Sequence, residues 1–372
     1  MGILSITKKT TAMLATALIV LLLALLLLMG AFWAISPGKP KPYLDQNGQP
    51  LAGSLAEKVF VDIGGARQGM FIKSKDARQP VLLYLHGGMP DYFLTRKYPT
   101  GLEDLFTVAW WEQRGSGISY SPDIPPETMT LEQMIKDVVE AANYLRRRFG
   151  QEKIYLMGHS GGTFIGIQVA AQAPDLFHAY IGIAQMSDQL QSERLAYAYM
   201  LERFRQDGNM KMVRKLEAAP VVDGTPPAYL IVRDQAMHQL GIGTTRDMNS
   251  VVTGVFLPSL TCRDYTLKEK INMWRGKAQS GVSSMWDEML ATNLSDQLSA
   301  LDIPIYFFAG LHDYTVSSVL ARAFFEQLQA PVKGFYLFEE SAHSPLFEEP
   351  EKTRQILRED VLKGENGLAD LK

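Results

Sequence analysis

The sequence predicts an α/β fold in which a mainly parallel sheet is covered by helices on both faces. Apolar runs without polar alternation are typical of strands buried on both sides of a sheet, and they occur at 80–85, 106–111, 153–157, 180–184, 303–308 and 333–338. Helical patterns stand between several of these runs, at 130–145, 161–173 and 317–328. Such alternation favours parallel strands joined by crossover helices.

The N-terminal segment predicts a membrane anchor over residues 1–36. No charged residue occurs from Thr10 to Gly38, and residues 12–35 supply 24 positions, where a bilayer core needs about 20. A signal-peptide core is shorter, roughly 7–15 residues, and the only small-residue cleavage pattern, at 34–36, is followed by Pro37. We therefore expect an uncleaved, single-pass anchor with the N-terminus in the cytoplasm and the globular domain outside it.

A linker and a hairpin are expected to follow the anchor. Residues 37–51 begin with a run rich in proline and glycine, which favours an extended linker. The core then begins at 52, where strands at 57–63 and 68–73 flank Gly64 and Gly65 and so predict an antiparallel opening to the sheet.

The stretch 187–300 interrupts the strand and helix rhythm and predicts a helical cap. It has no clear strand pattern, but it has amphipathic stretches such as 195–204 and 228–238. A structureless loop of this length inside a compact domain would be exceptional. The core is thus expected in two parts, 52–186 and 301–372, with the cap inserted between them. Tyr197, Tyr199, Met200 and Phe204 either pack the cap helices or line an apolar pocket.

The pentapeptide Gly158-His159-Ser160-Gly161-Gly162 predicts a nucleophilic serine. It fits G-x-S-x-G and stands directly between a predicted strand and a predicted helix, the context that exposes a serine hydroxyl on a sharp turn. Small residues on either side let the backbone make this turn without Cβ clashes. We expect Ser160 to be the nucleophile.

A serine nucleophile needs a base and a carboxylate that orients the base. His343 follows the last strand and is the expected base, whereas His312 is interpreted as a loop residue. Asp313 follows the strand at 303–308 and is the expected acid. Asp302 precedes that strand, so it would lie at the wrong edge, and Glu339 and Glu340 are interpreted as solvated.

Backbone N–H groups are also needed to stabilise an oxyanion. Gly161, directly after the nucleophile, is one expected donor. The turn after the strand at 80–85 offers the second, with Gly88 preferred and Met89 the alternative. His86 lies on this turn and is interpreted as structural.

Composition limits the possible partners and cofactors. The formal net charge is −3, so nothing in the electrostatics favours nucleic acid. The single cysteine, Cys262, matches no nucleophile turn and cannot form an internal disulfide. The expected partners are a small-molecule or peptide substrate and, through residues 12–35, a membrane. The serine chemistry requires no metal or organic cofactor.

Three motifs together resemble the proline iminopeptidase-like branch of the α/β-hydrolases. They are His86-Gly87-Gly88, the element Glu112-Gln113-Arg114-Gly115-Ser116-Gly117, and the turn around Ser160. The resemblance covers roughly 57–186 and 301–350, and it implies an aminopeptidase whose cap carboxylates hold a free amine. Glu193 and Glu202 stand at suitable places but are interpreted as solvated. Met89, His159, Gly161 and Glu112 depart from the branch's pattern.

The sequence therefore predicts a membrane-anchored serine hydrolase that cleaves a carboxyl ester or amide through an acyl-enzyme. Two alternatives stay open: a proline iminopeptidase-type aminopeptidase, and a binding protein that keeps the fold without the chemistry. Oligomeric state is not readable from the sequence.

Overall fold

A computed structural model describes residues 2–280 and 284–372 and contains one eight-stranded sheet in the order β1-β2-β4-β3-β5-β6-β7-β8. β1 pairs antiparallel with β2, β2 pairs antiparallel with β4, and the remaining neighbours are parallel. The predicted α/β-hydrolase fold is thus confirmed. The strands are β1 (Leu55–Ile63), β2 (Ala66–Ser74), β3 (Val81–Leu85), β4 (Thr107–Glu112), β5 (Ile154–His159), β6 (Phe177–Ile183), β7 (Ile305–Gly310) and β8 (Lys333–Phe338).

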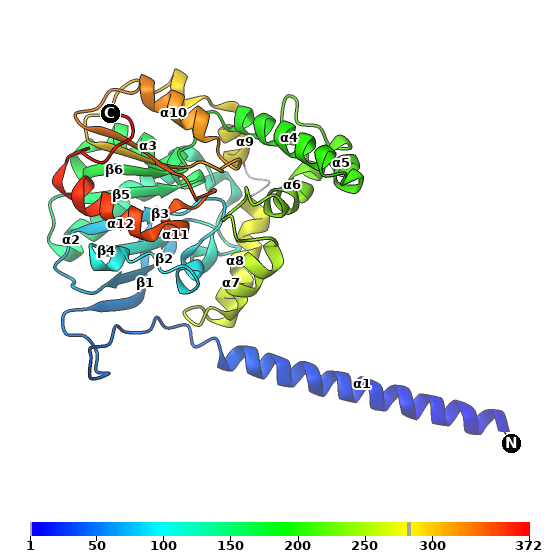
Figure 1. Cartoon of the computed structure of the whole chain (residues 1–372). Helices are drawn as coiled ribbons and strands as arrows, with labels where there is room; N and C mark the ends of the chain where they lie inside the picture. Colours follow the sequence, from blue (N-terminus) through cyan, green and yellow to red (C-terminus); the bar gives the residue numbers. More distant parts are fainter. Residues whose placement is uncertain (1, 281–283) are drawn as a thin grey trace.

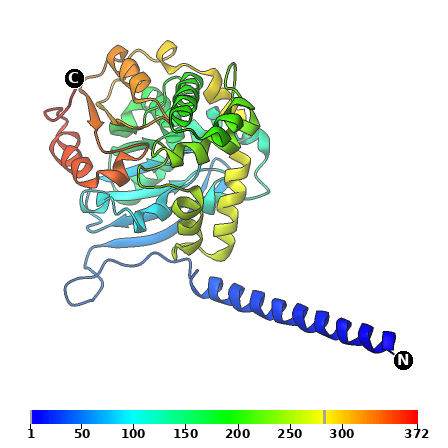
Figure 2. The same ribbon diagram turned by 45° about the vertical axis from the view of Figure 1, so that its right-hand side comes forward.

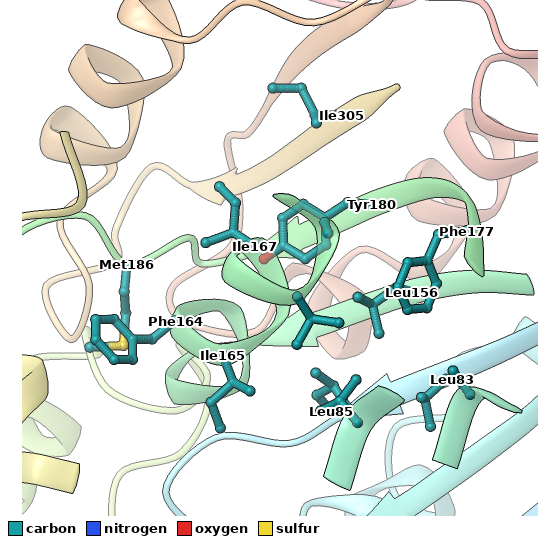
Figure 3. Close-up of a cluster of buried hydrophobic side chains, with 14 of the residues drawn as sticks. Leu83, Leu85, Leu156, Phe164, Ile165, Ile167, Phe177, Tyr180, Met186 and Ile305 are labelled. Atoms are coloured by element: carbon teal, nitrogen blue, oxygen red, sulfur yellow. The ribbon is translucent and has the colours of Figure 1, made fainter. Parts of the chain in front are cut away.

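Helices cover both faces of the sheet because alternate strand residues point to opposite sides. On β3, Leu83 and Leu85 join the apolar cluster under α2 (Leu131–Phe149), α3 (Gly161–Gln172) and α10 (Ser318–Gln327). Leu82 and Tyr84 join the cluster on the other face, with the short helix η1 (Tyr92–Arg96), α11 (Pro345–Glu348) and α12 (Pro350–Glu359). Figure 3 shows the first cluster, in which Ile165 and Ile167 of α3 lie beside the central strands.

Local signals explain where several of these elements begin and end. The N–H of Gln133 donates to the Thr130 hydroxyl at 3.2 Å and caps α2, and the helix ends at Gly150, which has a φ of 65°. Gly64 and Gly65 both have positive φ and close the hairpin between β1 and β2. β1 and β2 extend two residues or so beyond the strands predicted from sequence.

The segment between β6 and β7 contains several helices within the part of it that the structure describes. α4, α5 and α6 pack around their own apolar cluster, which contains Met200, Phe204 and Tyr229. Tyr197 and Tyr199 pack against the same cluster, so these side chains serve the packing of the cap. The elements are α4 (Gln189–Gln206), α5 (Met210–Glu217), α6 (Pro227–Gln239), η6 (Val252–Phe256), α7 (Leu257–Thr261), α8 (Leu267–Ser280) and α9 (Ser284–Ala291).

A long N-terminal helix, α1 (Gly2–Ala34), projects away from the globule (Figure 1). Its segment Met13–Ala34 is long and apolar enough to cross a membrane, and none of it is buried in the globule. A buried core helix would be covered by other elements. The segment is therefore a candidate membrane span, and a signal sequence has the same features.

Candidate active site

Ser160 stands on a strained turn between β5 and α3. Its φ of 55° and ψ of −126° lie in a region that residues with a side chain rarely occupy. The turn is held by a hydrogen bond from the Ser160 N–H to the Ile183 carbonyl at 3.0 Å. The position two residues after Ser160 needs glycine, since a Cβ on Gly162 would lie 2.2 Å from the Leu85 carbonyl oxygen. These surrounding contacts maintain the strained turn and keep Ser160 at the end of β5.

Asp313 and His343 meet beyond the carboxyl ends of the neighbouring strands β7 and β8. Nδ1 of His343 lies 2.9 Å from Oδ2 of Asp313, and both side chains are buried. The other oxygen, Oδ1, accepts the N–H groups of Thr315 at 2.8 Å and Val316 at 2.9 Å. These bonds orient the carboxylate toward the imidazole. Burial lowers the pKa of His343 below its ordinary value, although the charge of Asp313 and its hydrogen bond act to raise it.

The other candidate acids and bases lie elsewhere. Asp302 is exposed in the loop that leads into β7, and Glu339 and Glu340 are exposed after β8. The side chain of His312 does not line the cavity that contains Ser160 and His343. None of these rival acids and bases is among the residues that line the cavity at Ser160.

A second aspartate and histidine pair lies directly behind the first. Nδ1 of His159 lies 2.9 Å from Oδ2 of Asp91, and Nε2 lies 2.9 Å from the backbone carbonyl of His343. Tyr84 donates to the same Asp91 oxygen at 2.6 Å. Burial acts to lower the pKa of His159, but Asp91, the His343 carbonyl and the charge of Asp313 together raise it above its ordinary value. A protonated His159 donates to both partners and ties the His343 loop to β5. Sequence reasoning missed this role, although His159 stands inside the serine pentapeptide.

A cavity of about 430 Å³ joins these groups at the carboxyl edge of the sheet, between the core and the cap. Ser160, His343, Gly87, Gly88, Met89 and Gly161 all line it. Gly161 is the first residue of α3, so its N–H has no acceptor within the helix. Gly87 approaches the serine most closely, because a Cβ there would lie 2.7 Å from the Ser160 Cβ. The expected oxyanion turn therefore faces the serine.

His86 has the structural role that its position suggested. It is buried, its Nε2 accepts the N–H of Gln113 at 3.2 Å, and its Nδ1 lies 2.7 Å from the Gly87 carbonyl. Burial lowers the pKa of His86 to about 4, against the opposing charge of Asp91. A neutral imidazole with its proton on Nδ1 satisfies both contacts and holds the oxyanion turn against the strand end.

The cavity wall is largely apolar and rich in methionine. Methionine is unbranched and adapts to irregular shapes, so it suits a pocket for a flexible apolar group. No group of three or more side chains able to hold a metal occurs among the residues that the structure describes. The methionines of the wall are Met89, Met129, Met134, Met186, Met237, Met285 and Met289.

Comparison with known proteins places this architecture in a family. The family model for the alpha/beta hydrolase fold matches residues 80–350, which include most of both parts of the core and the helical segment between them. The chain belongs to the α/β-hydrolase family. It is also 33% identical over 308 residues to the protein named probable aminopeptidase YbaC of Bacillus subtilis (strain 168), with 81% of this chain and 95% of that protein covered. The resemblance to the proline iminopeptidase-like branch is thereby confirmed, and the protein is a hydrolase.

Two solved structures share the fold of this hydrolase. The proline iminopeptidase of Mycobacterium smegmatis is 18% identical, with a TM-score of 0.55, and 82% of this chain and 98% of that chain are covered. A structure described as a membrane phospholipase A is 16% identical, with a TM-score of 0.59, and 97% of this chain and 98% of that chain are covered. The second match therefore extends over nearly all of this hydrolase.

Glu193 of the hydrolase is not the solvated residue that the sequence predicted. It is fully buried, and its two oxygens accept from Nη2 and Nε of Arg233, each at 2.7 Å. Tyr229 and Gln189 donate to the same carboxylate at 3.0 and 2.9 Å. The prediction failed because Arg233 comes from α6, a helix that sequence spacing cannot place beside α4. Glu202, in contrast, is exposed as predicted.

The element 112–117 is structural in this hydrolase. Arg114 forms a buried, two-pronged ion pair with Asp137 of α2, with Nε to Oδ2 at 2.7 Å and Nη2 to Oδ1 at 2.9 Å. Glu112 is buried, accepts from Tyr265 and accepts the Ile118 N–H at 2.6 Å. Burial raises the pKa of Glu112 to about 8, although both hydrogen bonds act to lower it. The element therefore connects the sheet, α2 and the cap.

Cys262 takes no part in the site. Its thiol is buried in the cluster between the sheet and the cap, and burial raises its pKa to about 11. A thiol with so high a pKa is protonated at neutral pH and is a poor nucleophile.

Proposed function

We propose that this hydrolase is a serine hydrolase, with Ser160 as nucleophile, His343 as general base and then acid, and Asp313 as the residue that orients His343. The 2.9 Å contact between His343 and Asp313, at a cavity that Ser160 also lines, carries the proposal. In this mechanism Ser160 attacks a carbonyl carbon while His343 takes its proton. The protonated His343 then donates to the leaving group, and water activated by the same imidazole releases the acyl group from Ser160.

The oxyanion of the tetrahedral intermediate is assigned to the N–H of Gly161 and an N–H of the turn at Gly88, with Met89 as the alternative. Such donors stabilise charge that develops only as the carbonyl is attacked, and each is worth about 10²–10³ in rate. The proximity of the oxyanion turn to Ser160 supports the assignment.

We propose an ester with an apolar acyl group as the substrate. The methionine-rich wall supports this choice, and so does Glu193, whose charge is already matched by Arg233. A carboxylate can hold the amine of a substrate only if it is not already paired, and Glu193 is paired with Arg233. The second candidate is an aminopeptidase of the proline iminopeptidase type, which the similarity to probable aminopeptidase YbaC favours.

We also propose that residues 1–36 anchor the enzyme in a membrane and that the catalytic domain lies outside the cytoplasm. In this division of the chain, 37–51 form the linker, and 187–300 form a cap inserted between the two core parts, 52–186 and 301–372. The length and apolar composition of Met13–Ala34 support the anchor. Accessibility of the globule to protease added outside intact cells tests the orientation, since a domain on the cytoplasmic side would be protected.

A fluorophosphonate probe tests the chemistry directly. The probe should label the wild-type chain and not Ser160→Ala, and labelling that persists in Ser160→Ala would overturn the assignment. Rates on p-nitrophenyl esters and on aminoacyl amides, including proline amide, then separate the two substrate classes. Faster turnover of proline amide would favour the aminopeptidase.

A further inference from the structure

One short helix of the cap, residues 252–261, has an apolar face that no described part of the protein covers. η6 and α7 form this helix, in which apolar residues predominate. Val252, Phe256 and Leu257 are 57%, 37% and 46% exposed. Exposed apolar side chains that lie together mark a binding surface more often than scattered ones do.

The opposite side of the same helix forms part of the cavity wall. Val251 and Val255 line the cavity that holds Ser160 and His343. Phe256 packs edge-on against Trp274, with ring centroids 5.1 Å apart, and Trp274 lines the cavity as well. One layer of side chains therefore separates the exposed apolar face from the catalytic cavity.

The helix is also held close to the end of the candidate membrane span. The N–H of Gly38 donates to the carbonyl of Arg263 at 3.1 Å, and Lys270 of α8 donates to the Ser36 hydroxyl at 2.7 Å. Lys58 and Glu269 pair at 2.8 Å beside this junction. Figures 1 and 2 both show the yellow-green segment of α7 and α8 next to the point where α1 meets the globule. These contacts hold the segment 263–270, which directly follows α7, against the residues that directly follow α1.

The charges at this junction match an anionic lipid surface. Lys39, Lys41, Arg263 and Lys268 are all exposed, and none of them forms an ion pair with another residue in 2–280 or 284–372. Basic residues beside a membrane span attract anionic headgroups, and an amphipathic helix next to them can bury its apolar face at the acyl boundary.

We propose that helix 252–261 lies in the bilayer–water interface beside α1, with Val252 and Leu257 in contact with lipid. Because the inner face of this helix lines the catalytic cavity, the cavity then lies close to acyl chains held in the membrane. The occupant of the apolar face is the lipid bilayer itself. This inference rests on the proposed anchor and on the proposed serine chemistry, and it goes beyond both by assigning the cap as the membrane-contacting element.

Depth-dependent quenching in vesicles tests the contact. Leu257→Cys and, as the control, Val319→Cys are made in the full chain, labelled with an environment-sensitive fluorophore, and reconstituted in vesicles of phosphatidylcholine and phosphatidylglycerol. Val319 is 71% exposed on α10, which Figure 1 shows on the side of the globule away from α1. Native Cys262 is buried and should label little, and the wild-type chain measures that background.

Lipids carrying a doxyl group on the acyl chain should quench the fluorophore at 257 and leave the one at 319 unquenched. Equal quenching at both positions overturns the proposal. A chain that does not float with the vesicles contradicts the anchor, which is a separate failure.

A kinetic measurement tests the consequence for catalysis. The double variant Val252→Gln, Leu257→Gln should lower kcat/KM for a long-chain ester embedded in vesicles by at least about threefold, because it removes apolar contact with lipid. The rate on a soluble short-chain ester should not change. A loss shared by both substrates, or no loss with either, would contradict the proposal, whereas the absence of both activities in the wild type would contradict the serine hydrolase assignment.

Discussion

Nδ1 of His343 lies 2.9 Å from Oδ2 of Asp313, although 30 positions separate the two residues along the chain. Each stands on the loop that follows a strand, and β7 and β8 are parallel neighbours, so their carboxyl ends meet at the same edge of the sheet. Two N–H groups turn the carboxylate toward the imidazole. The order of the strands in the sheet thus brings the carboxylate of Asp313 to the imidazole of His343.

Replacing Asp313 tests this relationship. Asp313→Asn should lower kcat/KM by about 10³–10⁴-fold, because an amide neither holds the required tautomer nor stabilises the imidazolium. Circular dichroism should show a folded protein. Asp302→Asn is the matched control and should leave the rate unchanged, since Asp302 is exposed in the loop that leads into β7 and does not line the cavity. Equal losses in the two variants would contradict the assignment.

The pH dependence of the rate reports on His343. The base must be neutral, so kcat/KM should rise with pH through the pKa of His343. Because burial lowers that pKa, against the opposing charge of Asp313, the midpoint of the acid limb should lie below 6.5. A stable ester assayed from pH 4 to pH 9 gives the profile. A midpoint above 6.5 would be inconsistent with His343 as the base.

The buried pair of Arg233 and Glu193 should be important for stability. Arg233→Met leaves the Glu193 charge without its partner and should lower the free energy of unfolding by about 3–5 kcal/mol. Arg205→Met breaks an exposed pair with Glu217 and should cost at most about 1 kcal/mol. Denaturant titrations measure both. Adding Glu193→Gln to Arg233→Met should recover part of the loss, and similar losses in the two single variants would argue against a role for burial.

Two adjacent glycines should differ in their tolerance of a methyl group. A Cβ on Gly162 would lie 2.2 Å from the Leu85 carbonyl oxygen, whereas one on Gly161 would lie 3.6 Å from its nearest neighbour, Met289. Gly162→Ala should therefore lower the free energy of unfolding by at least about 1–3 kcal/mol. Gly161→Ala should stay near the wild-type value. Thermal unfolding of the two variants makes the comparison, and a larger loss in Gly161→Ala would show that the turn is packed differently.

Much of the core could be predicted from local pattern. Continuous apolar runs predict strands buried on both faces, and the residues around Ser160 predict a sharp turn because only small residues fit there. Helices within 187–300 could be expected from the sequence, since helices have a short repeat that is visible along the chain. The strand ends were less accurate, since pairing with a neighbour extends β1 and β2 beyond their apolar residues.

The interior contacts of the site were not predictable in the same way. Glu193 looks like any glutamate of an amphipathic helix until α6 brings Arg233 against it. His159 looks like a variable position until Asp91 and the His343 carbonyl are seen at its two ring nitrogens. In both cases the partner is distant in sequence, and neither residue type indicates by itself that a partner exists.

The sequence by itself determined the strand and helix order, the placement of Ser160 on a glycine-lined turn and the apolar N-terminal segment, because each depends on residues close together in the chain. Only the tertiary structure decided that Asp313 meets His343, that Glu193 is neutralised, and that helix 252–261 lies between the catalytic cavity and the base of α1. Those relationships depend on which strands are neighbours and which helices cross, and packing between distant segments determines both.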